Sequence, residues 1–548
     1  MNRFRLILIA ALVSAAQYCW ADNYPINRAL DIQHYAFQLT LSDQSDEIVG
    51  ETTIQVLFKT ADSKRLRLDF ANQNPKTGGK GMLVEGVFFQ NKRISFQHAD
   101  DVLWIDLPQA FGSNSVASFV IKYRGVPADG LRIGLNKYGA RCFFNENWPN
   151  RTRQWLPTVD HPYDKATNEF IIKAPAHYQV VSNGLLVEES IISPQLKLTH
   201  WKQLVPISSW LYVLGVAEFA VQQVGDFNGK PIQTWVYPQD RDNGFYDFAN
   251  PTKDAMEFYS MYVGPYAYEK LANIQSPSVG GGMETASAIF YAENLVNGKR
   301  DNRMKSVVIH EVAHQWFGNA VTESTWDDAW LSEGFATYFT LLFQEYYYGS
   351  SVYTAELKKS RLRIFDYYKK DSTYKIVDNR TAEEGPVTNN MTYQKGAWFL
   401  HMLRNKMGPE AFMQGIRAYY KKFYNANATT DDFMAEMQKF CLSPLNGFFN
   451  QWLKRPEVLN IKGSWQYDTK TAQLTVNLQQ LQHSDFIFDM PVEIQIIGEG
   501  NQSTQFITIN INSKSTTVKL PVSQKPVAIL ADPNTLLLAK IAFMELPQ

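Results

Sequence analysis

One short segment carries two histidines and a glutamate with the spacing of a metal site. His310, Glu311 and His314 form the run His310-Glu311-x-x-His314. Because residues four apart lie on one face of an α-helix, both imidazoles can reach a single cation, and Glu311 lies within reach of a water bound to that cation. Two histidines at this spacing can also be unrelated surface or capped side chains, so the pattern alone leaves both interpretations open.

Three further features favour the metal. The chain has only nine histidines, and two of them fall here. The flanking segments 307–309 and 316–317 are apolar, so the helix is expected to be buried. Polar side chains on a buried helix need a specific partner, because burying them alone is costly. Glu333 follows His314 after the eighteen residues 315–332 and starts another helical segment. Alone it could be a solvated acid at a helix start, but three protein ligands and a water form a catalytic zinc site. We therefore predict one Zn²⁺ per chain, held by His310, His314 and Glu333.

Three other segments are considered together with the histidine motif. Residues 281–285 read Gly-Gly-Met-Glu-Thr, residues 393–396 read Tyr-Gln-Lys-Gly, and residues 153–162 read Arg-Gln-Trp-Leu-Pro-Thr-Val-Asp-His-Pro. With the histidine motif, they resemble the gluzincin aminopeptidases, the family that includes aminopeptidase N and leukotriene hydrolase. The resemblance runs from about residue 23 to the end of the chain. It differs from the family pattern at Thr285, where the family has Asn.

The resemblance implies a zinc metallo-aminopeptidase that hydrolyses N-terminal residues from peptides by attack of a zinc-bound water. Glu311 then acts as the general base and returns the proton to the leaving amine. The phenol of Tyr393 stabilises the oxyanion. The carboxylate of Glu284 anchors the α-ammonium of the substrate, which distinguishes an exopeptidase from an endopeptidase. The expected substrate-binding residues are Gly281, Gly282, Met283 and Glu284.

Several alternatives remain open at this stage. The same zinc site could serve an endopeptidase of broader specificity, in which no group anchors the amine. A non-catalytic peptide-binding module or an epoxide hydrolase is a further possibility, although the sequence gives no separate signal for either. The family also places a second amine-binding residue five positions before Arg153, where this chain has Trp148, which cannot accept a hydrogen bond from an ammonium. Glu146 or Asn147 could replace it.

Hydrophobic patterning predicts an α+β multidomain protein. A chain of 548 residues is too long for one hydrophobic core, so two to four domains are expected. Apolar residues alternate, as in strands, within 34–41, 51–58 and 117–123 and again within 473–478, 492–497 and 517–520. They recur at helical spacing within 301–317, 330–348, 393–406, 409–424 and 431–441.

We interpret this order as three domains. They are an N-terminal β domain over residues 22–224, a zinc catalytic domain over 225–455 and a C-terminal β-sandwich over 456–548. By resemblance, the first is the saddle-shaped β-rich domain of the family and the second is thermolysin-like and α-rich. The formal net charge of −1 gives no reason to expect nucleic acid or an anionic membrane as partner. We expect peptides with a free N-terminus as substrates. The oligomeric state stays open, with a monomer as the default.

The first 21 residues have the pattern of a signal peptide. Arg3 and Arg5 precede an apolar run over residues 6–16, and Ala21 offers a cleavage site. A run of this length is too short for a stable membrane span, which needs about 20 residues, although a signal anchor or a buried helix is an alternative. We therefore expect export to the periplasm or the extracellular space. Cys142 and Cys441 could then pair, but two unpaired thiols are at least as compatible with the sequence.

Overall fold

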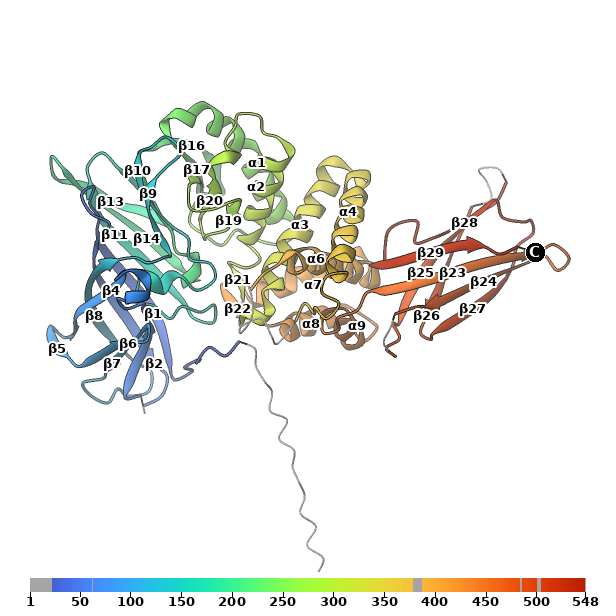
Figure 1. Cartoon of the computed structure of the whole chain (residues 1–548), viewed down its shortest axis with the longest axis horizontal. Coiled ribbons are helices and arrows are strands. Elements are labelled where there is room, and N and C mark those ends of the chain that lie inside the picture. Colours follow the sequence, from blue (N-terminus) through green and yellow to red (C-terminus); the bar gives the residue numbers. More distant parts are fainter. Residues whose placement is uncertain (1–21, 62, 378–386, 483–484, 500–503, 548) are drawn as a thin grey trace, which may run out of the picture.

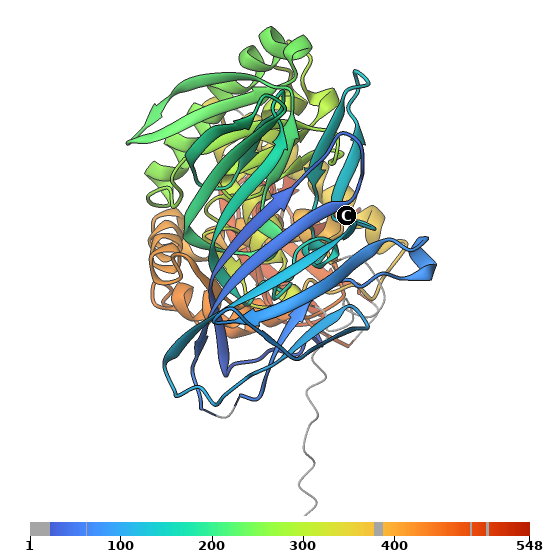
Figure 2. The same cartoon turned by 90° about the vertical axis from the view of Figure 1, so that its left-hand side faces the viewer.

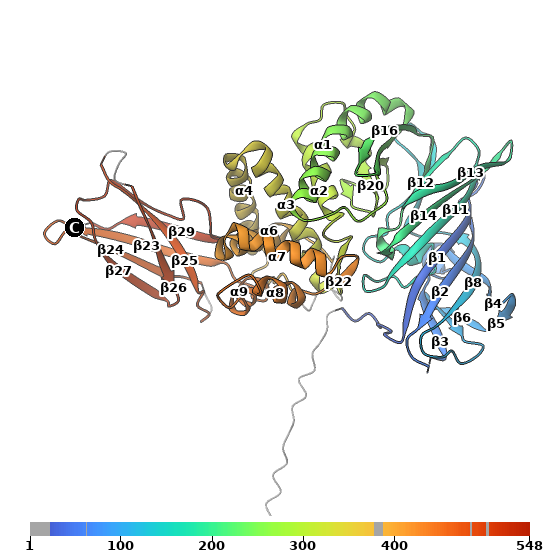
Figure 3. The same ribbon diagram turned by 180° about the vertical axis from the view of Figure 1, so that it is seen from behind.

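The computed structural model describes residues 22–547 except 62, 378–386, 483–484 and 500–503. The predicted signal peptide therefore lies outside the described residues. Two β regions lie at opposite ends of the molecule, and a helical region joins them (Figure 1; Figure 3 shows the same order from behind). The predicted succession of β, α-rich and β segments is confirmed. No helix among the described residues is long and apolar enough to cross a membrane.

The N-terminal β region is built on one large sheet, seen from its own side in Figure 2. Strand β1 (Leu30–Thr40) lies inside this sheet and pairs antiparallel with β2 (Ile48–Phe58) and parallel with β11 (Lys165–Pro175). Buried residues alternate along β1, so one face of the sheet covers the core. A second sheet of four strands runs in the order β12 (Gln179–Ser182), β15 (Leu214–Ala217), β10 (Arg141–Asn145), β9 (Leu131–Leu135). The strands of the large sheet are, in spatial order, β13 (Leu185–Ser193), β14 (Leu196–Ser208), β11 (Lys165–Pro175), β1 (Leu30–Thr40), β2 (Ile48–Phe58), β8 (Ser115–Val126), β4 (Gly81–Phe89) and β5 (Lys92–Ile94).

The catalytic region begins with a five-stranded sheet. Its first two strands form a hairpin through Asn228 and Gly229, both with positive φ, as a two-residue hairpin turn requires. The hairpin starts at Ala220, so this sheet includes residues 220–224, which lie before the boundary expected from the sequence. The strands are, in spatial order, β16 (Ala220–Phe227), β17 (Lys230–Val236), β18 (Leu271–Ser276), β20 (Ala288–Ala292) and β19 (Gly282–Met283).

Eight named helices accompany this sheet in the described residues. Five correspond to predicted segments, and the Thr429–Asp432 capping box is present at the start of α8. The helix with the histidine motif ends at His314, three residues before the expected end, because the chain turns there toward Gly318 (φ 105°). The hydrophobic pattern did not predict α1, α4 and α9. The helices are α1 (Arg241–Tyr262), α2 (Asn302–His314), α3 (Trp330–Tyr348), α4 (Ser350–Tyr368), α6 (Asn390–Met407), α7 (Pro409–Lys422), α8 (Thr430–Gln438) and α9 (Asn446–Leu453).

The C-terminal region consists of two small antiparallel-rich sheets, in accord with the predicted sandwich. An ion pair between Arg361 and Asp532 (3.1 Å) and a hydrogen bond between His401 Nε2 and the carbonyl oxygen of Thr535 (2.9 Å) attach it to α4 and α6. Cys142 and Cys441 are both free thiols. The sheets have the orders β27 (Ser515–Pro521), β24 (Gln473–Gln480), β23 (Leu459–Asp468), β29 (Ala539–Glu545) and β26 (Gln505–Ile511), β25 (Met490–Ile497), β28 (Ala528–Ala531).

Candidate active site

Two helices bring the three predicted metal ligands together. His310 and His314 lie on one face of α2, whose N-terminus is capped by Asp301, and Glu333 lies in the first turn of α3, which packs against α2. The Nε2 atoms of His310 and His314 are 3.1 Å apart. Glu333 Oε2 lies 3.4 Å from the first and 3.2 Å from the second. The three ligand atoms thus form a nearly equilateral triangle.

The His314 ring is held in the tautomer that suits a metal ligand. Its Nδ1 lies 3.1 Å from the carbonyl oxygen of Phe317, which can only accept a hydrogen bond, so Nδ1 carries the proton. Ser332 Oγ lies 3.0 Å from the same nitrogen. The lone pair of Nε2 therefore points toward His310 and Glu333. Supporting contacts of this kind are typical of metal-bound histidines.

The size of the triangle fits a zinc ion. Zinc–nitrogen and zinc–oxygen bonds of about 2.0–2.1 Å in a tetrahedron place neighbouring ligand atoms about 3.3–3.4 Å apart. The observed separations of 3.1–3.4 Å are close to this value. In addition, Glu333 Oε2 is buried, and apart from the two imidazole nitrogens of the triangle it accepts no hydrogen bond from any described residue. A buried carboxylate oxygen is costly unless positive charge compensates it.

Tyr393 reaches the triangle from α6. Its hydroxyl donates a hydrogen bond to Glu333 Oε1 (2.6 Å), and its ring stacks on that of His310 with the centroids 5.9 Å apart. The phenol therefore lies beside the ligands, as expected from the sequence. In this structure its proton is engaged with Glu333.

Glu311 lies next to the ligands and faces strand β19. Its carboxylate is buried, and Oε2 has no hydrogen-bond partner among the described residues. Gly282 lies directly opposite, and a Cβ on this residue would meet the Glu311 side chain at less than 3 Å. By contrast, a Cβ on Gly280 or Gly281 would meet nothing within 4 Å. Of these three glycines, only Gly282 is required by a close neighbour, and that neighbour is the Glu311 side chain.

Glu284 follows β19 and completes a second acidic cluster. Ligand atoms of Glu284, Glu311 and His314 all lie within 4.8 Å of one another. The Glu284 side chain is 5% exposed. Strand β19, which precedes it and includes Met283, is the last strand of its sheet, and no described strand pairs with its outer edge.

Two side chains from the segment that follows α2 hold the Glu284 loop. The carbonyl oxygen of Glu284 accepts hydrogen bonds from Gln315 Nε2 (3.0 Å) and Asn319 Nδ2 (2.5 Å). The hydroxyl of Thr285, the residue that departs from the family pattern, donates to the carbonyl oxygen of Ala288 (2.5 Å). Thr285 thus closes the turn after Glu284. The sequence analysis did not identify Gln315, Asn319 or Ser332, because an uncharged side chain near a motif carries no signal of its own.

Burial and mutual repulsion govern the charges of this cluster. Burial raises the pKa of Glu311 well above its usual range, and the carboxylate of Glu284 raises it further. The pKa of Glu284 is also raised, mainly by burial. Burial opposes a charge on His314, but the carboxylates of Glu284 and Glu333 outweigh it and raise the pKa of its imidazole. Three buried carboxylates around two imidazoles form a site that favours a cation.

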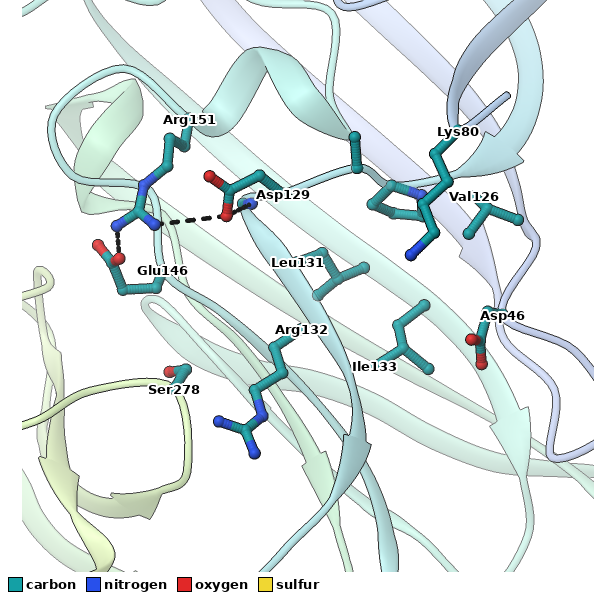
Figure 4. A pocket seen from close by; sticks show the side chains of 13 residues that line it. Asp46, Lys80, Val126, Asp129, Leu131, Arg132, Ile133, Glu146, Arg151 and Ser278 are labelled. Atoms are coloured by element: carbon teal, nitrogen blue, oxygen red, sulfur yellow. Dashed lines mark hydrogen bonds and ion pairs between the residues drawn. The ribbon is translucent and has the colours of Figure 1, made fainter. Parts of the chain in front are cut away.

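The residues considered for a second amine contact are engaged elsewhere. Figure 4 shows Arg151 between Glu146 and Asp129 in a polar pocket of about 340 Å³. Asn147 Oδ1 accepts a hydrogen bond from the indole of Trp155 (3.0 Å). Trp148 packs edge-on against two other tryptophans, with ring centroids 4.9 Å apart in both pairs. Neither Glu146 nor Asn147 is left free to bind an amine.

The chain is similar to known proteins of one peptidase family. Residues 248–452 match the Peptidase family M1 domain, and residues 32–211 match the Peptidase M1 N-terminal domain. Glutamyl aminopeptidase from Mus musculus is 32% identical over 324 residues, which are 56% of this chain and 33% of that protein. Glutamyl aminopeptidase from Bitis rhinoceros is 31% identical over 451 residues, which are 77% of this chain and 46% of that protein.

A solved structure shares the fold. The crystal structure of a mutant M1 zinc metallopeptidase from Deinococcus radiodurans superposes with a TM-score of 0.65 at 24% identity. The match covers 78% of this chain and 94% of that one. The chain therefore spans most of the solved structure, but less than half the length of the two glutamyl aminopeptidases.

Proposed function

The chain belongs to the M1 peptidase family, and we propose that it is a zinc metallo-aminopeptidase that removes N-terminal residues from peptides. The observation that carries this proposal is the adjacency of two groups of side chains. A triangle of His310, His314 and Glu333 is suited to zinc, and the Glu284 carboxylate lies beside it. The triangle suits hydrolysis of a peptide bond, and the Glu284 carboxylate suits recognition of a free amine.

His310, His314 and Glu333 would hold the metal. Zinc in such a site supplies a Lewis acid and lowers the pKa of a bound water to about 7. Phe317 and Ser332 orient His314 for this task, and Tyr393 holds the second oxygen of Glu333.

Glu311 and Tyr393 would carry the proton and the charge of the reaction. The buried Glu311 has a raised pKa, so its carboxylate is a stronger base than an exposed one. It accepts the proton of the attacking water and passes it to the nitrogen of the leaving peptide. The Tyr393 hydroxyl lies next to the ligands and turns from Glu333 to the oxyanion as negative charge develops there.

Glu284 would anchor the α-ammonium of the substrate. Gln315 and Asn319 fix its backbone, and the open edge of β19, formed by Gly282 and Met283, supplies main-chain groups for an extended peptide. The Glu284 carboxylate would then hold the amine while Glu311 lies at the first peptide bond. Cleavage therefore releases the first residue.

We also propose that the protein is exported and that its signal peptide is cleaved after Ala21. The basic residues Arg3 and Arg5 and the apolar run over 6–16 support this. Asp22, the first residue after the expected cleavage point, accepts hydrogen bonds from His161 Nε2 (2.6 Å) and the backbone amide of Trp326 (2.9 Å). N-terminal sequencing of the secreted or periplasmic protein is expected to begin at Asp22. An intact N-terminus in the exported fraction would contradict cleavage.

The direct test of hydrolysis combines metal analysis with an assay. The purified protein is expected to contain one zinc per chain and to release the dye from alanine 4-nitroanilide. A chelator should abolish the activity, and added zinc should restore it. Glu311→Gln should retain the metal and lose activity by a factor on the order of 10³ or more. Full activity of metal-free protein, or of Glu311→Gln, would overturn the proposal.

A further inference from the structure

A groove leads away from the candidate active site between three helices. Most of its lining residues come from α2, α3 and α4, and α3 packs against both other helices. Figure 1 shows where these three helices lie. The part of the groove next to the site has a volume of about 260 Å³ and includes His310, Glu311 and Tyr393 among its lining residues. A second part of about 710 Å³ continues it. The two parts share the lining residues Ser306, Gln344, Glu356 and Arg363, so they adjoin one another and are treated as one groove.

The groove lies on the side of the site where the leaving part of a peptide must go. Glu284, the proposed amine anchor, is not one of the described residues that line it, whereas Glu311 is. A peptide whose amine is held at Glu284 and whose first carbonyl carbon lies at Glu311 therefore continues into this groove. Its residues after the scissile bond would follow α3.

The helices set how many residues the groove accommodates. Ser306 and Arg303 precede His310 by one and two turns of α2 and line the groove on the same face as His310. The seven residues from Arg303 to His310 span about 10 Å along the helix. An extended peptide advances about 3.3 Å per residue, so about three residues after the scissile bond reach Arg303.

Two helices of the groove, α3 and α4, contribute polar atoms without partners. Thr337 Oγ1 and Gln344 Oε1 on α3 and Ser360 Oγ on α4 are buried and form no hydrogen bond with any described residue. Ser360 is only 5% exposed. Because buried polar atoms in folded proteins nearly always have partners, these three atoms are available to a polar ligand. The amide groups of an extended peptide backbone offer both donors and acceptors there.

The charges around the groove are strongly one-sided. Apart from Glu311 at the candidate active site, its only acidic lining residue among those described is Glu356, and this residue is paired with Lys359 at 2.6 Å. Arg303 and Arg363 form no ion pair with any described residue. Lys305 lies 5.7 Å from the ring centroid of Tyr348. The groove therefore keeps an excess of positive charge along its far half, including two guanidinium groups suited to carboxylates.

We propose that this groove binds the leaving segment of the peptide and selects a carboxylate within about three residues of the scissile bond. The carboxylate is either the C-terminus of a short peptide or the side chain of an acidic residue. This inference rests on the proposed aminopeptidase function and adds the substrate class. Arg363 meets the carboxylate nearest the scissile bond, because it lines both parts of the groove, and Arg303 meets one further along.

Two pairs of substrates distinguish the two sources of the carboxylate. The tetrapeptide Ala-Ala-Ala-Ala is compared with its C-terminal amide, and Ala-Ala-Asp-Ala amide with Ala-Ala-Asn-Ala amide. Each kcat/KM is normalised to that of alanine 4-nitroanilide, which has no residue after the scissile bond. We expect the wild type to prefer the charged member of at least one pair by roughly three- to tenfold, with the preference decreasing at high salt.

A double variant and a matched control complete the test. In R303Q/R363Q the preference should fall toward one. Lys358→Gln removes an exposed positive charge from α4 at a residue that lines neither part of the groove, and it should keep the wild-type preference. Equal rates within both pairs, an unchanged preference in the double variant, or the same loss in the control would each overturn the inference. Absence of anilide hydrolysis in the wild type would instead contradict the proposed function.

Discussion

Gly282 lies so close to Glu311 that a Cβ atom at residue 282 would meet the glutamate side chain at less than 3 Å. The backbone at this position shows no positive φ, so space and not backbone conformation requires the glycine. The strand edge proposed to bind the substrate and the proposed general base are thus in direct contact. A change in one displaces the other.

The variant Gly282→Ala tests this contact. The added methyl group should push the carboxylate of Glu311 out of place, and a misplacement of about 1 Å can cost about a hundredfold in rate. We expect kcat to fall by about that factor while metal content stays unchanged. Gly280→Ala is the matched control, because a Cβ there would meet nothing within 4 Å. Equal kcat values for the two variants would show that the contact is unimportant.

The orientation of His314 should determine metal affinity. Ser332→Ala removes one of two groups next to His314 Nδ1 and leaves the carbonyl of Phe317 in place. Loss of such a supporting contact typically weakens metal binding by 10- to 100-fold, and we expect about tenfold because the carbonyl remains. Competition with a chromophoric chelator measures the change. Unaltered affinity would assign the orientation of the ring to Phe317 alone.

Tyr393→Phe separates oxyanion stabilisation from metal binding. The hydroxyl donates to Glu333 Oε1 and is the candidate donor to the oxyanion, but it is not a metal ligand. We expect kcat to fall by about 10²–10³ with the zinc content retained. A decrease in zinc content would show that the phenol acts mainly through Glu333. An unchanged kcat would exclude it from the reaction.

A buried lysine predicts how stability depends on pH. Lys395 Nζ donates to the hydroxyl of Tyr368 (2.7 Å), and burial lowers the pKa of the amine from 10.5 to about 7. Above pH 7 the folded protein loses this proton while the unfolded chain keeps it up to about pH 10.5, so the unfolded chain binds more protons in that window. The contribution of Lys395 to stability therefore rises with pH, by at most about 1.4 kcal/mol per pH unit.

The pH dependence is measured as the difference in stability between the wild type and a variant without the lysine. Thermal unfolding of the wild type and Lys395→Met is compared at pH 7 and pH 9. We expect the wild type to gain stability relative to the variant at the higher pH, because Met lacks the titrating group. Lys358→Met, at an exposed position on α4, should show no such difference. Parallel shifts in wild type and Lys395→Met would contradict the lowered pKa.

The sequence predicted those parts of the fold that depend on local patterning. Alternation identified β1, β2 and β8, and α3 was predicted with its observed bounds because Gly349 ends the apolar pattern. Helix α1 was missed because Gly244 and Pro251 interrupt its pattern. Helix α4 was missed because apolar and polar residues are mixed along it, and its buried face is defined only by packing against α3 and α6.

The site was predictable where its residues are close in sequence. His310 and His314 lie four residues apart on α2, on the same face, so their proximity follows from the helix alone. The approach of Glu284 to Glu311 depends on how an edge strand packs on a helix, and only the family resemblance indicated it. Gln315 and Ser332 act through hydrogen bonds to a backbone or ring atom, and no spacing rule identifies such partners.

The most direct measurement of the central claim compares a tetra-alanine peptide with its N-acetylated form, with products identified by mass spectrometry. We expect the wild type to release single alanine residues from the free peptide and to cleave the acetylated one at least about a hundredfold more slowly. In Glu284→Gln this discrimination should largely disappear, while the metal content stays at one zinc per chain. Cleavage of both peptides at equal rates by the wild type, or cleavage of the acetylated peptide at an internal bond, would contradict an aminopeptidase anchored at Glu284.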